Sequence, residues 1–309
     1  MPVLANLRFL TLAALPLFGQ TLETPRTASV FHAASHSVRP IIGMTGASHL
    51  GPASYSDLDF ASIAPDQRNA ILVAGNQTRL TRNIQNADAI AIENAISFVD
   101  RILWSSDSGT AILFSSVNRQ LQWLVNGQLS AVTNLPENAL LLTVAHDGRT
   151  AITTANGRIY RITSDTAPVQ IALLTNPTAA TFDSEGLTLY FADSTTNEIV
   201  ELRDTGNSYT QRTFLSAADG IEDPVALRLT PDNAALYVAM KAPRAISSYR
   251  TLDKALLMRL PLDWAPSSFE SLSPETFLLN PAAPIGEPLS VLMTRNGLAE
   301  FFIPAGDAK

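Results

Sequence analysis

Acidic and amide side chains recur along this chain just ahead of short apolar segments, where strands are expected to begin. Carboxylate and amide oxygens are the ligands that a hard cation such as Ca²⁺ prefers, in sets of about 6–8. If these strands converge on one axis, the side chains form a ring at the mouth of a central channel, which is a candidate ligand site. Asn and Asp also cap turns before strands, so turn capping is the alternative. The six residues are Asp57, Asp100, Asn138, Asn176, Asp223 and Glu287.

A basic segment is the second candidate site. The protein has a formal net charge of −7, yet residues 241–255 bring together four positive charges and a tyrosine. We interpret this segment as an insert in a place that needs only a tight turn. Such a loop is a candidate contact for a protein partner or an acidic glycan, and a solvated hairpin is the alternative. The contact residues would be Lys241, Arg244, Tyr249, Arg250 and Lys254.

Composition excludes several other kinds of chemistry. None of the 309 residues is a cysteine, which excludes disulfides, thiolate metal sites and a cysteine nucleophile. No run of Lys and Arg is longer than two, so a nucleic acid or an anionic membrane surface is not expected as a partner. The sequence contains neither a G-x-S-x-G elbow nor a glycine-rich phosphate loop. We therefore assign no catalytic residue.

The elements that must position these residues form a repeat. A short apolar strand, a turn rich in Asp, Asn or Gly, and a second β-rich strand recur six times, roughly every forty residues. This spacing is typical of the blades of a β-propeller, and six copies predict six blades. The Pro-rich stretch 263–288 could conceal a seventh blade, which is the alternative. The six hairpins begin near residues 62, 103, 143, 180, 228 and 292.

One repeat carries a family resemblance. Residues 177–204, PTAATFDSEGLTLYFADSTTNEIVELRD, are similar to blades of the NHL, YVTN, TolB-like and gluconolactonase-type propellers, and the resemblance extends over 38–305. It implies an all-β propeller and little about activity. In gluconolactonase-type enzymes a Glu, an Asn and an Asp hold one metal in the channel mouth. Asp57 or Asp59, Asn176 and Asp223 match in type and order, but Pro follows Asn176 and Asp223 where that family has Gly.

The two ends of the chain predict how the protein is exported and closed. Arg8 precedes an apolar run from residue 9 to 18, the layout of a secretory signal peptide. We expect a signal peptide over 1–20, a linker over 21–37, one propeller domain over 38–305 and a tail over 306–309. We expect residues 38–44 to pair with 298–305 as the outermost strand of the last blade, because an open ring would leave an exposed edge.

Two functions from different classes follow from this organisation. The leading hypothesis is a non-catalytic binding or scaffold module, exported to the periplasm or beyond, monomeric and without a membrane span in its mature form. Its ligand would be a protein, a small molecule or a glycan. The alternative is a metal-dependent hydrolase of lactonase type, with Ca²⁺ as the possible cofactor at the channel mouth.

Overall fold

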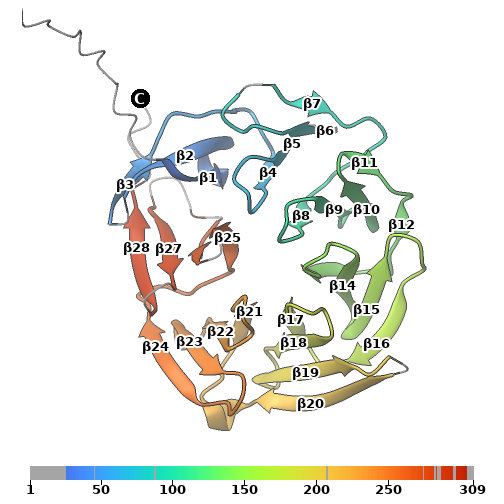
Figure 1. Ribbon diagram of the computed structural model, residues 1–309, viewed down its shortest axis with the longest axis vertical. Helices are drawn as coiled ribbons and strands as arrows, with labels where there is room; N and C mark the ends of the chain where they lie inside the picture. Colours follow the sequence, from blue (N-terminus) through green and yellow to red (C-terminus); the bar gives the residue numbers. More distant parts are fainter. Residues whose placement is uncertain are drawn as a thin grey trace, which may run out of the picture.

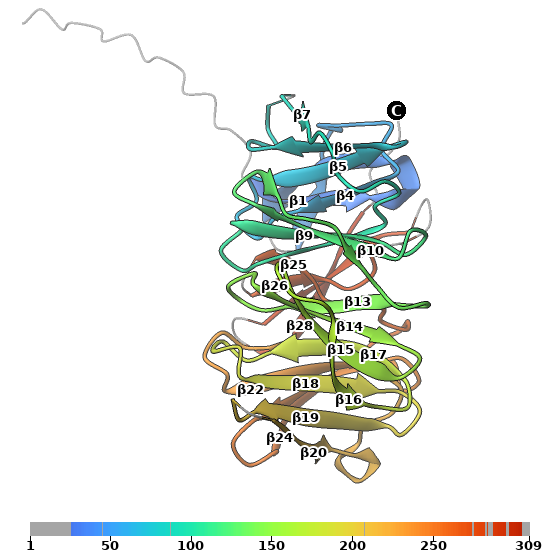
Figure 2. The same ribbon diagram turned by 90° about the vertical axis from the view of Figure 1, so that its right-hand side faces the viewer.

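A computed structural model describes residues 26–304, apart from 45, 87, 207, 274, 282, 284–286 and 295–296. The strands of these residues form seven antiparallel sheets around a central axis, so the fold is a seven-bladed β-propeller (Figure 1). Figure 2 shows the disc edge-on, with the strands crossing its thickness. Its described helices are two short 3-10 turns, η1 (Ala33–Ser35) and η2 (Ala217–Asp219). None of the described helices has the length and apolarity needed to cross a membrane.

Blades 4, 5 and 6 show the repeat in its regular form, with four strands running in chain order from the axis to the rim. Blade 4 contains β13 (Leu140–Val144), β14 (Thr150–Ala155), β15 (Arg158–Thr163) and β16 (Val169–Leu173). Blade 5 contains β17 (Pro177–Phe182), β18 (Thr188–Asp193), β19 (Glu198–Asp204) and β20 (Tyr209–Leu215). Blade 6 contains β21 (Pro224–Leu229), β22 (Ala235–Met240), β23 (Ala245–Arg250) and β24 (Leu256–Pro261).

The other blades are less regular. Blade 1 has three strands, β1 (Arg26–His32), β2 (Ser37–Met44) and β3 (Ala47–Leu50). Blade 2 contains β4 (Phe60–Ile63), β5 (Ala70–Ala74), β6 (Gln77–Thr81) and β7 (Ile90–Ala91). Blade 3 contains β8 (Arg101–Trp104), β9 (Thr110–Ser115), β10 (Gln120–Val125) and an interrupted rim strand, β11 (Gln128–Leu129) and β12 (Thr133–Asn134). Blade 7 contains β25 (Glu270–Ser273), β26 (Thr276–Leu278), β27 (Leu289–Met293) and β28 (Ala299–Ile303).

The repeated aspartates form the first hairpin turn of a blade, as the repeat predicts. Asp107 accepts the backbone N–H of Gly109 at 2.9 Å, and Asp232 accepts that of Ala234 at 3.0 Å. A carboxylate that bonds its own backbone two residues on makes a tight turn favourable. These turns also join neighbouring blades, since the Asp66 N–H donates to Ser108 Oγ at 2.9 Å.

The core lies between the blades, where the faces of adjacent sheets meet. Trp123 on β10 is 1% exposed, and its indole N–H donates to the Gly148 carbonyl of blade 4 at 3.0 Å. A similar interface joins blades 5 and 6, where Tyr190 and Phe214 of blade 5 form one apolar cluster with Leu236 and Tyr249 of blade 6. Sheet faces packed in this way hold each blade against both neighbours.

The expectation of six blades is wrong because one blade carries no hairpin of the expected type. Five of the six predicted hairpins are the first two strands of blades 2 to 6, and the sixth, near residue 292, is β27 and β28 of blade 7. The Pro-rich stretch supplies β25 and β26 of that same blade. The additional blade comes from the N-terminal segment, so residues 26–37, expected to be a linker, form β1, η1 and the start of β2. The predicted signal peptide and C-terminal tail lie outside the described residues.

The innermost strand of blade 1 runs in the direction opposite to that of blade 2. Phe31, near the end of β1, packs on Phe60 at the start of β4, with ring centroids 5.9 Å apart. The Ser29 N–H, further back on β1, donates to Gln67 Oε1 at 2.6 Å, in the turn that follows β4. The inner strands β1 and β4 therefore run antiparallel. By contrast, β17 and β21 run the same way, since Thr178 Oγ1 at the start of one donates to the Pro224 carbonyl at the start of the other.

The predicted closure of the ring is also wrong. Residues 38–44 belong to β2, which pairs with β1 and β3 in its own blade, while β28 pairs with β27. Blade 7 already has four strands and needs no fifth. Pro40 is tolerated in this central strand because β3 ends at Leu50, opposite Ile41, so the missing N–H faces the end of the ladder. Blades 1 and 7 meet instead through side-chain packing, with β3 beside β28 (Figure 1).

Residues 241–255 are not an insert. They form the turn after β22, the whole of β23, and the turn before β24. β23 pairs with a strand on each side and is mostly buried. The sequence suggested only a tight turn at this place. The extra residues are in fact the third strand that a regular blade contains. Shortening it would therefore remove a central strand.

Candidate functional site

Two of the predicted channel-mouth residues hold the turn between the second and third strands of their blades. The Asp100 carboxylate accepts the Ser116 N–H at 3.1 Å and also the Ser116 hydroxyl. Asn176 donates through its amide to Ser194 Oγ at 2.9 Å. Both side chains precede an innermost strand, as expected, but each has a local backbone role. These contacts agree with the turn-capping interpretation.

Three others adopt a backbone conformation that favours Asn and Asp. Asp57, Asn138 and Asp223 have φ of 58°, 59° and 44°, in the left-handed region. Asn and Asp tolerate this region better than other residues with a Cβ. The backbone therefore accounts for these residue types without a ligand. Ligand binding by them stays a prediction.

Glu287 differs from the other five predicted residues in its position within the blade. It is exposed and precedes β27, the third strand of blade 7, and not an innermost strand. Across the described residues, no three His, Cys, Asp or Glu side chains lie close enough to share a metal ion. The predicted ring is thus distributed over separate turns, and a Ca²⁺ site at this mouth stays a hypothesis.

The residues of the predicted partner contact lie in different environments. Tyr249 is 1% exposed and donates to the Asp219 carbonyl at 2.9 Å, so it belongs to the core. Arg250 is paired with Asp253 at 2.8 Å, and the Lys254 ammonium lies 5.5 Å from the centre of the Phe214 ring. Arg244 donates to the Asp263 carbonyl and Lys241 is exposed in the turn after β22. They do not form one surface loop.

Three ionisable side chains on innermost strands were missed from the sequence. Burial raises the pKa of Glu270, on β25, to about 7. Burial lowers the pKa of Arg228, on β21, whose guanidinium lies 5.5 Å from the centre of the Phe277 ring. Burial also lowers the pKa of Arg101, on β8, against the opposite effect of Asp100. All three lie within short strands and not in the polar loops before them, so no turn motif in the sequence marks them.

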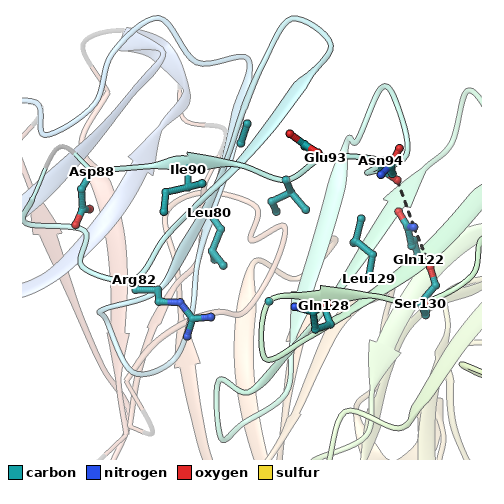
Figure 3. A pocket seen from close by; sticks show the side chains of 13 residues that line it. Leu80, Arg82, Asp88, Ile90, Glu93, Asn94, Gln122, Gln128, Leu129 and Ser130 are labelled. Atoms are coloured by element: carbon teal, nitrogen blue, oxygen red, sulfur yellow. Dashed lines mark hydrogen bonds between the residues drawn. The ribbon is translucent and has the colours of Figure 1, made fainter.

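The described surface has an open groove on the rim between blades 2 and 3. Its volume is about 710 Å³, and it lies between β6 and β7 on one side and β10 and β11 on the other. Leu80, Ile90, Ile92 and Leu129 give it an apolar base, as Figure 3 shows for those it labels. This volume lies within the range of about 300–1,000 Å³ that is common for ligand sites.

The groove exists because the rim strands on both sides are short. β7 has two residues, and β11 and β12 have two each, whereas β20 of blade 5 has seven. The connection 82–89, RNIQNADA, is rich in Asn and Asp, which favour turns over a long strand. Among the described residues, the rim strands on both sides are therefore too short to cover the gap between the blades.

Charged side chains of both signs line the groove, with Asp88 and Arg82 on one side and Glu93 on the other (Figure 3). Asp88 already accepts the Thr81 hydroxyl at 3.1 Å. Arg82 lies near Gln128 on one side, and Glu93 lies near Asn94 on the other (Figure 3). Arg82 makes one hydrogen bond, to the Asn126 carbonyl at 3.2 Å, and so keeps further N–H groups available. Glu93 has no hydrogen bond or ion pair within the described ranges.

A buried amide holds one wall of the groove in place. Gln122 is 3% exposed, and its Oε1 accepts the Ile96 N–H at 3.0 Å. Its Nε2 donates to the Ser130 carbonyl at 3.0 Å and to the Asn94 carbonyl at 3.5 Å (Figure 3). One side chain thus ties the connection between blades 2 and 3 to the rim strand of blade 3. The groove is preformed.

A smaller groove of about 470 Å³ lies at a similar place between blades 4 and 5. Its charged groups are already engaged. Arg212 forms a two-pronged pair with Glu201, at 2.9 and 2.8 Å, and Asp193 accepts the backbone N–H of Thr175. The groove between blades 2 and 3 is therefore the stronger candidate site. In the sequence, the absence of a six- or seven-residue β-rich run between residues 82 and 99 was the signal that could have indicated it.

The comparisons with known proteins support the fold alone. No protein-family model matches the chain, and no curated protein matches it in sequence. It is similar in structure to a functionally unknown protein from Desulfotomaculum acetoxidans, at 13% identity and a TM-score of 0.62, over 89% of this chain and 94% of that one. It is also similar to hydrazine synthase of Kuenenia stuttgartiensis, at 12% identity and a TM-score of 0.55, over 94% and 99%. At such identities, membership of the NHL or TolB-like group stays a hypothesis.

Proposed function

We propose that this protein is a binding module whose ligand site is the groove between blades 2 and 3. The observation that carries the proposal is the groove itself, which is preformed, of ligand size, apolar at its base and lined by charged side chains of both signs. A concave apolar site with a few placed polar groups is the usual form of a ligand pocket. The proposal keeps the binding role expected from the sequence and moves the site from the channel mouth to the rim.

The hydroxyl of the groove supports binding over covalent chemistry. Ser130 Oγ accepts the backbone N–H of Trp123 at 3.0 Å and donates to the Ala131 carbonyl at 2.8 Å. A serine nucleophile needs a base that takes its proton, and this hydroxyl instead donates to a carbonyl. We therefore place the role of the groove in recognition. No observation on the described residues favours the lactonase alternative.

Methyl-detected NMR tests the proposal. A mixture of small-molecule fragments and short peptides is added to protein with labelled Ile, Leu and Val methyl groups. We expect binders to shift the Ile90, Ile92 and Leu129 signals and to lose this effect in Ile90→Glu. Leu173→Glu is the matched control, because Leu173 is similarly exposed, at 62% against 75%, and lines the other groove. If binders shift only methyl groups elsewhere, the groove is not the site.

We also propose that the module acts outside the cytoplasm, on the strength of the N-terminal sequence. Expression of the full sequence in a bacterial host tests this. We expect the protein in the periplasmic fraction with a new N-terminus near residue 20. Cytoplasmic protein that keeps Met1 would contradict it.

A further inference from the structure

We infer that the groove binds an extended peptide, which adds as a strand beside β7; this inference rests on the proposed function. β7 pairs with β6 on one side only, with Leu80 opposite Ile90 and Arg79 opposite Ala91. It is the outermost strand of its blade, so its second edge carries no partner among the described strands, and both of its residues line the groove. An extended chain can pair with such an edge, as in other peptide-binding proteins that extend a sheet.

The pairing of β7 identifies the backbone groups that a peptide would meet. The Ile92 N–H bonds the Thr78 carbonyl and therefore points inward to β6. Backbone groups of an antiparallel ladder alternate in direction, so the N–H and C=O of Ala91 point outward. Ala91 lines the groove, and its small side chain leaves this edge accessible. A peptide residue can exchange both hydrogen bonds with it.

The side chains of the groove select the chemistry of the peptide. Alternate side chains of a strand point to the same face, so every second peptide residue falls on the face of Ile90 and Ile92, across the groove from Leu129. At one end the peptide meets Arg82, beside which Asp88 is already bonded to the Thr81 hydroxyl, and at the other end it meets Glu93. The matching ligand is a short segment with an apolar centre, an acidic residue toward Arg82 and a basic residue toward Glu93.

Labelled peptides of one length test this inference directly. The probe is the capped peptide acetyl-Asp-Leu-Val-Leu-Lys-amide, with versions that carry two Asp or two Lys ends, and a version N-methylated at the two Leu residues and Val. Fluorescence anisotropy measures the affinity of each. We expect the mixed-charge probe to bind best. N-methylation should weaken it about tenfold, because it removes main-chain hydrogen bonds.

Charge reversal of the protein is the second arm. Arg82→Glu should weaken the probe about fivefold and shift the preference toward the peptide with two Lys ends, because an exposed ion pair is replaced by repulsion. Arg203→Glu, at an exposed arginine on β19 of blade 5, is the matched control and should change nothing. Circular dichroism confirms that both variants are folded.

The outcomes separate this inference from the proposed function. Equal binding of the N-methylated probe, an unchanged charge preference in Arg82→Glu, or no peptide binding at all overturns the peptide inference. If small-molecule fragments still shift the Ile90 methyl signal, the groove remains a ligand site and only its ligand class is wrong. If neither peptides nor fragments shift that signal, both proposals are wrong.

Discussion

Replacement of Glu270 by Gln should stabilise the protein at alkaline pH and leave it unchanged at acid pH. Glu270 lies on the innermost strand of blade 7, and burial raises the pKa of its carboxyl from 4.5 to about 7. The folded protein therefore holds this proton more tightly than the unfolded chain does. Protonation of Glu270 therefore stabilises the folded protein fully below about pH 4.5, and this contribution is lost as the pH rises through about 7.

The magnitude follows from the difference between these two pKa values. Each pKa unit corresponds to about 1.36 kcal/mol, so the complete effect would be roughly 3 kcal/mol. Glu270 as a whole keeps partial contact with solvent, although its carboxyl is buried. Solvent screening reduces the effect, and we expect about 2 kcal/mol. Gln keeps the shape of the protonated acid and carries no charge at any pH.

Urea unfolding of both proteins between pH 4.5 and 8.5 measures this difference. The variant should match the wild type near pH 4.5 and exceed it by about 2 kcal/mol at pH 8.5. Burial, with Arg39 contributing, lowers the pKa of His32, which costs stability as the pH falls below about 6.5; both proteins share this effect, so it cancels. Glu137→Gln, at an exposed loop residue, is the control. A constant difference at all pH values would refute the reasoning.

Three further changes test the packing of the ring. Trp123→Phe should cost about 1–3 kcal/mol in urea unfolding, because it leaves the Gly148 carbonyl without its donor; an unchanged midpoint would contradict this. Replacing 242–254 by a short turn should abolish the cooperative thermal transition, since it removes β23; a folded product would show that this strand is dispensable. Gly127→Ala should cost about 1 kcal/mol, because φ is +88° and the new methyl would lie 2.8 Å from Arg82 Nη2; a stability equal to wild type would refute that strain.

The repeating hairpins could be predicted because they are local. An aspartate that bonds the backbone two residues on, between two β-rich runs, encodes its own turn whatever the neighbouring blades do. Asp66, Asp107, Asp147 and Asp232 all form such turns, and the spacing of these turns predicts a propeller. The all-β fold class is therefore confirmed.

Blade 1 could not be predicted in the same way. Its first hairpin has the sequence AASH, with none of the expected Asp or Gly, and turns through the 3-10 helix η1 and a left-handed His36. Proline is usually confined to edge strands, but Pro40 lies in a central one where the adjacent ladder ends. These features depend on the position of β3 and on packing against Phe60, which the local sequence does not encode.

None of the side chains predicted to bind a ligand at the channel mouth lines the groove. Asp100 and Asn176 hold turns, as the alternative interpretation of these residues expected. The groove forms because the rim strands of two blades, near Arg82 and near Leu129, are too short to cover the space between the blades. A gap between blades is a property of the assembled disc, and no single stretch of sequence describes it.

The inner strand of blade 1 gives the molecule an unusual order of assembly. β1 contacts β4, which follows it closely in the chain, and β25, which leaves the ribosome more than two hundred residues later. Through synthesis of blades 2 to 6, one side of β1, with Ala28 and Val30, has no native neighbour to cover it. Contacts so distant in sequence form slowly and leave apolar surface exposed meanwhile. Because no strand among the described residues is exchanged between blades 1 and 7, this last step is the docking of two finished sheets, which can also separate without either one unfolding.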